Sequence, residues 1–203
     1  DDTASNPLAG EGGLIFTVLN QVNNTTNSYY AVAAQTVGGK HILEDSFGLF
    51  THIAITFKPA DPGAQNDVVT FYKDGQQWGN PQTIQDTPNY VHMRNTADVR
   101  FVIGNRAPNS GREFIGRLSS FLFFKHDGES GRSSSVLTSS EILALYNGGT
   151  ALANYNTHSK AGDLMAYYKM DEDTSQDPAA PEGAGPDGIQ DYSGNNNHIN
   201  FGA

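Results

Sequence analysis

The sequence predicts an all-β protein built as a sandwich of two antiparallel sheets. Turn residues rather than helices separate its β-prone segments, which cover residues 13–20, 28–37, 49–58, 67–79, 99–105 and 115–125. The 22 Gly and 9 Pro disfavour long helices, whereas 37% hydrophobic residues suffice for a core. A single domain over all 203 residues is expected, and a barrel of similar length stays an alternative.

Two of these segments carry specific local signals. In the stretch 52–57, His-Ile-Ala-Ile-Thr-Phe, apolar Ile53, Ile55 and Phe57 alternate with the other three residues, which predicts a strand with one buried face. Between the two β-prone arms of 67–79, Asp74-Gly75 is typical of a type I′ turn. We therefore expect an antiparallel hairpin there.

One short helix is predicted near residues 138–147. Thr138 or Ser139 can cap it, Glu141 lies in its first turn, and Gly148-Gly149 ends it. Residues 163–172 then read as a further strand, and residues 173–190, rich in Pro, Gly and Ala, as a long surface loop.

The charge restricts the partners of the protein. The formal net charge is −10, which would repel both nucleic acid and an anionic membrane surface. No apolar run approaches a membrane span of about 20 residues, so no membrane insertion is expected. The segment 163–191 contains eight acidic residues and one basic residue, Lys169.

The sequence contains no Cys and therefore no disulfide. Packing or bound ions must stabilise the fold.

Four segments, in order, resemble the laminin-G-like (LamG) branch of the concanavalin A-like lectin/glucanase superfamily. They are LFTHIAITFK (49–58), VTFYKDGQQWG (69–79), FVIGNRAPNSGREFIGRLSSFLFFK (101–125) and LTSSEILALYNGG (137–149). The resemblance implies a jelly-roll sandwich and a lectin-like, non-catalytic module. Phe50 replaces the Trp that is usual in this family.

The C-terminal stretch resembles the beginning of such a module. In LMAYYKMDED and DYSGNNNHINFGA, the family would have its first strand and an ion-binding loop, so residues 163–203 supply a first-strand-like segment out of the usual order. The chain is then circularly permuted, or it is part of a tandem array. In a third alternative, this strand completes the sheet of a neighbouring subunit.

A Ca²⁺ site is expected in the loop DYSGNNN, residues 191–197. Calcium takes six to eight oxygen ligands, and this loop supplies carboxylate, amide and backbone oxygens, although Asn/Gly runs also form plain turns. Where the resembled family often adds an Asp, this chain has Ser119 or Ser120, so a second carboxylate has to compensate. The expected metal-site residues are Asp191, Gly194, Asn195, Asn197, Asp171 and Asp173.

A carbohydrate or cell-surface glycan is the expected ligand. Aromatic faces stack on sugar rings, and Asn and Arg side chains hydrogen-bond to hydroxyls, although an aromatic residue at a hairpin is also a common packing partner. The expected ligand-binding residues, in or beside predicted loops, are Trp78, Tyr90, Arg94, Asn105, Arg106 and Arg112.

No catalytic residue is assigned. The cluster Asp171-Glu172-Asp173 suggests glycosidase or polysaccharide lyase chemistry, but it lacks the apolar spacers and the final Glu of the resembled glucanases. The six His show no paired metal spacing.

The expected function is binding or adhesion by an extracellular, cell-surface or virion protein. The rival is a structural subunit: a repeat of a surface filament, an adhesin or a phage capsid decoration, which contacts neighbouring repeats or forms a homo-oligomer.

Overall fold

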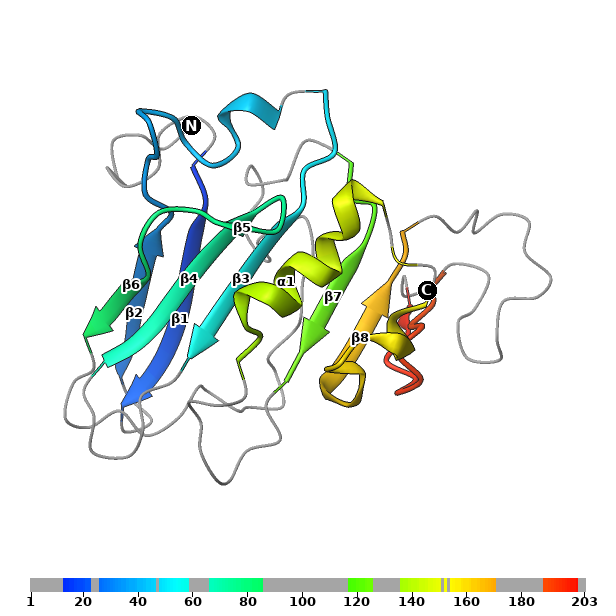
Figure 1. Ribbon diagram of the computed structural model, residues 1–203. Helices are drawn as coiled ribbons and strands as arrows, with labels where there is room; N and C mark the ends of the chain where they lie inside the picture. Colours follow the sequence, from blue (N-terminus) through cyan, green and yellow to red (C-terminus); the bar gives the residue numbers. More distant parts are fainter. Residues whose placement is uncertain are drawn as a thin grey trace. The chain divides into compact units, whose positions relative to one another are not determined.

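The structure is a computed structural model of the 203-residue chain (Figure 1). It describes residues 13–22, 26–46, 48–58, 66–85, 117–125, 136–150, 152, 154–170 and 188–200. These residues form mainly antiparallel strands with one short α-helix, which confirms the all-β prediction. The predicted strand 99–105 and most of the predicted loop 173–190 lie outside them.

The chain divides into two compact units, which are described separately. Unit 1 comprises Asp1–Ile115 and Glu129–Thr150, and unit 2 comprises Gly116–Gly128 and Ala151–Ala203. A single sandwich over the whole chain therefore stays a prediction.

Unit 1 begins with the antiparallel hairpin of β1 (Ile15–Val22) and β2 (Thr26–Ala33), in which Ile15 lies opposite Ala33. Next come β3 (Ile53–Lys58), β4 (Asn66–Lys73), β5 (Gln76–Gln77) and β6 (Gln82–Gln85). They form a four-stranded sheet in which β4 pairs with β3 on one edge and with β5 and β6 on the other.

The turn between β4 and β5 is the predicted hairpin turn. Asp74 and Gly75 both have positive φ, 49° and 76°, as a type I′ turn requires. The short strand β6 was not predicted, because its sequence Gln-Thr-Ile-Gln holds a single apolar residue and shows too little alternation.

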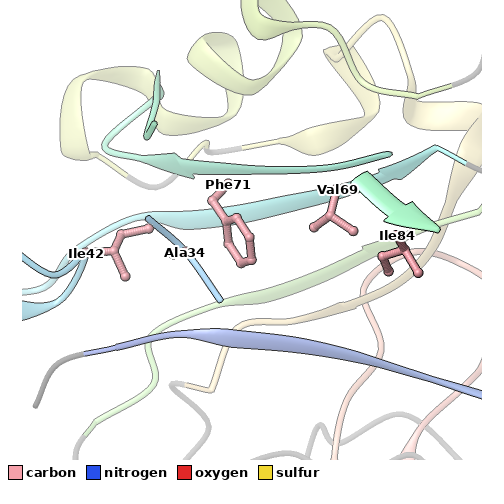
Figure 2. Packing of buried hydrophobic residues seen from close by; sticks show 5 residues of the cluster. All are labelled: Ala34, Ile42, Val69, Phe71 and Ile84. Atoms are coloured by element: carbon pink, nitrogen blue, oxygen red, sulfur yellow. The ribbon is translucent and has the colours of Figure 1, made fainter. Parts of the chain in front are cut away.

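The core of unit 1 is a cluster of Ala34, Ile42, Val69, Phe71 and Ile84. Figure 2 shows Val69 and Phe71, two residues apart on β4, directed into it from the same face of the strand. The β1–β2 hairpin adds Phe16, whose ring lies 5.5 Å from that of Phe57.

The buried face predicted for β3 is only partly confirmed. Ile53 and Phe57 pack against the core cluster, but Ile55 between them is 37% exposed. Thr56, on the opposite face, is only 8% exposed. Tyr72 of β4 is also buried, so the face of the sheet that carries Thr56 is covered in part as well.

The predicted helix is α1 (Ser139–Tyr146). Thr138 is its N-cap and forms a capping box with Glu141: Glu141 N donates to Thr138 Oγ1, and Thr138 N donates to Glu141 Oε2 at 2.8 Å. The helix buries Ile142 and Leu145 and ends at Asn147, which is left-handed.

Unit 2 contains a two-stranded antiparallel sheet of β7 (Phe121–Phe124) and β8 (Leu164–Tyr168), with Phe121 opposite Tyr168. β9 (Gly188–Ile189) and β10 (Ile199–Asn200) form a second short pair. The strand predicted at 163–172 is thus confirmed over Leu164–Tyr168, and its partner β7 belongs to the same chain. Whether β8 shares a sandwich with β3, as expected, stays a prediction.

In the described parts of the chain, every helix is too short or too polar to cross a membrane.

Candidate functional site

Residues 191–197, called the Asp191 loop below, hydrogen-bond to backbone groups of β8. The backbone of Tyr167 contacts it twice: Tyr167 N donates to Asp191 Oδ1 at 2.9 Å, and Tyr167 O accepts from Tyr192 N at 2.8 Å. Four residues predicted to bind metal, Asp191, Gly194, Asn195 and Asn197, therefore lie together in the structure.

The carboxylate of Asp191 is the centre of this loop. The residue is only 4% exposed, and four donors surround its two oxygens. Oδ1 accepts from Tyr167 N and Ser193 N, both at 2.9 Å. Oδ2 accepts from Ser193 Oγ at 2.8 Å and from Asn197 N at 2.9 Å. These four hydrogen bonds satisfy the acceptor sites of the carboxylate.

The two predicted Asn ligands use their amide nitrogens on the backbone of β8. Asn195 Nδ2 donates to Leu164 O at 2.7 Å and lies 3.2 Å from Met165 O. Asn197 Nδ2 donates to Met165 O at 2.8 Å. Because backbone carbonyls only accept hydrogen bonds, these contacts fix the amide groups with nitrogen toward the strand.

Left-handed backbone lets the loop turn tightly. Gly194 has φ 87°, and Asn196 has φ 58°. The ends of the loop are held by two further contacts. Asp191 N donates to His198 Nδ1 at 3.1 Å, and Tyr168 Oη donates to Asn197 O at 2.6 Å.

The hydrogen bonds also set the charge state of Asp191. Burial raises the pKa of its carboxyl, but the bonds from Tyr167, Ser193 and Asn197 outweigh burial, so the pKa lies below the ordinary value of 3.8. Asp191 is therefore ionised at neutral pH. Its buried negative charge is balanced by donated hydrogen bonds.

The predicted calcium ligands of the loop make hydrogen bonds in the described part of the chain. A calcium-ligating carboxylate turns its oxygens to the ion, whereas the Asp191 oxygens accept from four donors. Asn195 and Asn197 donate to β8 through their amide nitrogens. Calcium binding by this loop stays a prediction. Asp171 and Asp173, the other predicted carboxylate ligands, lie outside the described residues. Within the described ranges, no three His, Asp or Glu side chains gather closely enough to hold a metal ion.

Trp78 is the one predicted glycan-binding residue that the structure describes, and it has packing roles. Its indole N–H donates to Gln35 O at 2.7 Å, its side chain packs against the core cluster, and Lys73 Nζ lies 5.2 Å from the ring centroid. The remaining predicted ligand-binding residues lie outside the described part: Tyr90, Arg94, Asn105, Arg106 and Arg112.

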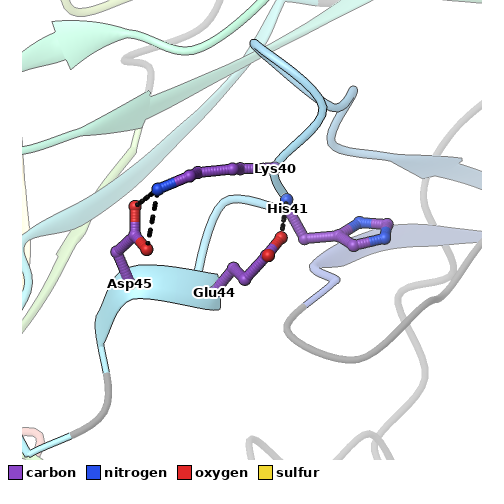
Figure 3. Close-up of polar contacts among 4 residues, drawn as sticks. All are labelled: Lys40, His41, Glu44 and Asp45. Carbon is purple, nitrogen blue, oxygen red and sulfur yellow. Dashed lines mark hydrogen bonds and ion pairs between the residues drawn. The ribbon is translucent and has the colours of Figure 1, made fainter.

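A second candidate site is an ordered loop of unit 1, residues 37–46 and 48–50, called the Phe50 loop below. Ile42 anchors it, since this side chain is fully buried in the core cluster. Two polar contacts brace it (Figure 3): Lys40 Nζ pairs with Asp45 Oδ2 at 2.8 Å, and His41 N donates to Glu44 Oε2 at 2.9 Å.

The Phe50 loop presents three apolar side chains to solvent. Leu49 is 73% exposed, Phe50 is 70% exposed, and Val37 is 42% exposed. Adjacent large apolar residues with this exposure on an ordered loop are typical of an interaction surface. In the sequence, Phe50 stands out only as the replacement for the Trp of the resembled family. Its exposure depends on how the loop folds, which no local pattern indicates.

His52 is a further polar residue of unit 1 for which the sequence gives no signal beyond the missing paired metal spacing of the His residues. Its backbone exchanges two hydrogen bonds with Asp74: His52 N donates to Asp74 Oδ1 at 3.0 Å, and Asp74 N donates to His52 O at 2.8 Å. Its ring centroid lies 5.8 Å from that of Tyr146 in α1. Burial lowers the pKa of His52, partly opposed by the Asp74 charge, so the neutral ring is favoured.

Comparison with known proteins identifies no family for this chain. Neither the family models, nor the curated proteins, nor the solved structures gave a match.

Proposed function

We propose that this chain is a non-catalytic binding module of an extracellular or virion surface protein, with the two-sheet jelly-roll sandwich expected from its sequence. Its ligand is a carbohydrate or another surface ligand, and the Phe50 loop binds it. The observation that carries this proposal is the exposure of Leu49 and Phe50, 73% and 70%, on a loop anchored by the buried Ile42.

The Phe50 loop suits such a ligand because it is braced before binding. An aromatic side chain held on an ordered loop loses little conformational entropy when it meets a ligand, which leaves more of the contact energy for affinity. The ring of Phe50 supplies a flat apolar face for the C–H groups of a sugar ring or for an apolar patch. Lys40 and Asp45, both exposed on the same loop, supply polar groups for hydrogen bonds at the rim.

The hydrogen bonds of Asp191 support a non-catalytic role. A catalytic carboxylate needs a lone pair for a proton or for attack on carbon. Among the described residues of unit 2, Asp191 is the one acidic residue that is buried. Four protein donors hydrogen-bond to its two oxygens. This residue is therefore assigned to structure.

The second candidate function is a structural repeat of a filament, an adhesin or a capsid decoration. Phe123 of β7 and the nearby Leu118 favour it, because both are large apolar residues of unit 2 with substantial exposure. In this case the apolar surface would be covered by a neighbouring copy, and the isolated chain would self-associate.

A binding assay with two matched variants tests the proposal. We expect the wild-type chain to bind one or more members of a glycan array or of a panel of surface polysaccharides, and Phe50→Ala to weaken that binding about tenfold or more. Leu118→Ala, which removes an exposed apolar side chain of unit 2, is the control and should bind like the wild type.

Equal binding by wild type and Phe50→Ala would contradict the assignment of the Phe50 loop. Binding to no glycan together with concentration-dependent self-association, measured by analytical ultracentrifugation, would favour the structural repeat.

A further inference from the structure

The edge of a β-strand needs partners for its backbone groups. β8 pairs with β7 along one edge, and the backbone groups that face the other edge would bind a second strand if nothing else covered them. Short β9 and β10 pair with each other and not with β8. The Asp191 loop lies where a further strand would otherwise pair.

The Asp191 loop replaces the hydrogen bonds of that strand. Tyr167 N donates to the Asp191 carboxylate, and Tyr167 O accepts from Tyr192 N. Leu164 O and Met165 O accept from the amides of Asn195 and Asn197. Three of the five residues of β8 are thus bonded to the loop, mainly through side chains rather than a second backbone.

The Asp191 carboxylate would have to give up hydrogen bonds to bind a cation. A calcium ion needs oxygens directed at it, so the Asp191 oxygens would lose bonds from Tyr167 N, Ser193 or Asn197 N. Asn195 and Asn197 bind Leu164 O and Met165 O through their amide nitrogens. The hydrogen bonds of the loop therefore compete with calcium ligation for the Asp191 carboxylate.

From this geometry we infer that the Asp191 loop is a metal-independent clasp, which closes the open edge of β8 with its own side-chain and backbone hydrogen bonds. The polar side chains whose composition suggests calcium instead make hydrogen bonds to β8. Asp191 accepts a hydrogen bond from the strand, and Asn195 and Asn197 donate hydrogen bonds to it. The inference does not depend on the proposed ligand of the Phe50 loop.

The first test is thermal melting of the full chain with excess chelator and with millimolar calcium. The clasp predicts melting temperatures that agree within about 1 °C, because a ligand stabilises a protein only when it binds the folded state. Asp191→Asn should melt several degrees lower than the wild type, by the same amount in both solutions.

Two outcomes of this test differ if calcium does raise the melting temperature. A rise that disappears in Asp191→Asn would overturn the inference, since the ion would then depend on Asp191. A rise that persists in Asp191→Asn would contradict the predicted equality of the two melting temperatures, and it would show that the ion binds without this carboxylate.

A second pair of variants keeps the test decisive if Asp191→Asn does not fold. Asn195→Asp replaces the amide that donates to Leu164 O by a carboxylate, which the clasp predicts to be destabilising in chelator and in calcium alike. Asn196→Asp adds the same charge to an exposed neighbour in the same turn and should melt like the wild type. Stabilisation of Asn195→Asp by calcium above the wild-type melting temperature would contradict the clasp.

Discussion

Replacing Phe71 by alanine is expected to lower the free energy of unfolding by about 3–5 kcal/mol. Phe71 is 1% exposed, and it belongs to the core cluster of unit 1 together with Ile42 and Val69. Its removal loses the transfer free energy of the ring and leaves a cavity that the surrounding strands fill only in part. Urea denaturation followed by fluorescence or circular dichroism measures this loss.

Ile55→Ala is the matched control for Phe71→Ala. Ile55 lies directly opposite Phe71 on β3, but it is 37% exposed, so its truncation should cost only about 1 kcal/mol. Similar losses for the two variants would contradict the placement of the core on the Phe71 cluster.

Replacing Asp191 by alanine is expected to destabilise the protein by about 3–5 kcal/mol, although the change removes few atoms. It leaves Tyr167 N, Ser193 N, Ser193 Oγ and Asn197 N without their common acceptor in a buried position. Each donor left without a partner costs about 1–3 kcal/mol, and local relaxation recovers part of the sum. Chemical denaturation of both proteins at neutral pH gives the difference.

Asp163→Ala serves as the control in the same unit. The Asp163 carboxylate forms a partly exposed ion pair with Lys160 at 3.7 Å, so its loss should cost under about 1 kcal/mol. A loss for Asp191→Ala no larger than that for Asp163→Ala would show that the four hydrogen bonds contribute little.

The contribution of Asp191 also has a defined pH dependence. Burial raises the pKa of this carboxyl, but its hydrogen bonds lower it further, to a net value below 3.8. A group whose pKa is lower in the folded state stabilises the protein above its unfolded pKa, and this contribution is lost as the pH falls through the folded pKa. The stability difference between wild type and Asp191→Ala should therefore be constant from neutral pH down to about 5 and shrink below about 4.

Signals that depend on a few adjacent residues predicted structure well. Asp74-Gly75 specifies its turn because few residue pairs adopt positive φ twice in succession. Thr138 and Glu141 mark the start of α1 because the capping box forms between residues three apart. The apolar run of β8 likewise predicted a strand.

Signals that depend on long-range pairing were not readable from the sequence. Asp191 meets the Tyr167 backbone 24 residues away, and Trp78 meets Gln35 across 43 residues. An oxygen-rich loop has the same composition whether its side chains face an ion or a strand, so composition alone does not distinguish the two arrangements. The hydrogen bonds of Asp191, Asn195 and Asn197 depend on the position of β8, which the local sequence does not give.

The arrangement of β8 bears on how the C-terminal segment is used. One edge of this strand pairs with β7, and the Asp191 loop binds backbone groups on the other, all within one chain. Completion of a sheet within the chain and donation of the strand to a neighbouring subunit both stay predictions for residues 163–203.

Amide hydrogen exchange at Tyr167 and Tyr192 tests the metal-independent clasp most directly, because these two N–H groups join β8 to the Asp191 loop. In the full chain with excess chelator, the account predicts that both amides exchange about a hundredfold or more slowly than in an unstructured peptide. Exchange of both amides at the unstructured rate in chelator, with protection appearing only after calcium is added, would contradict it.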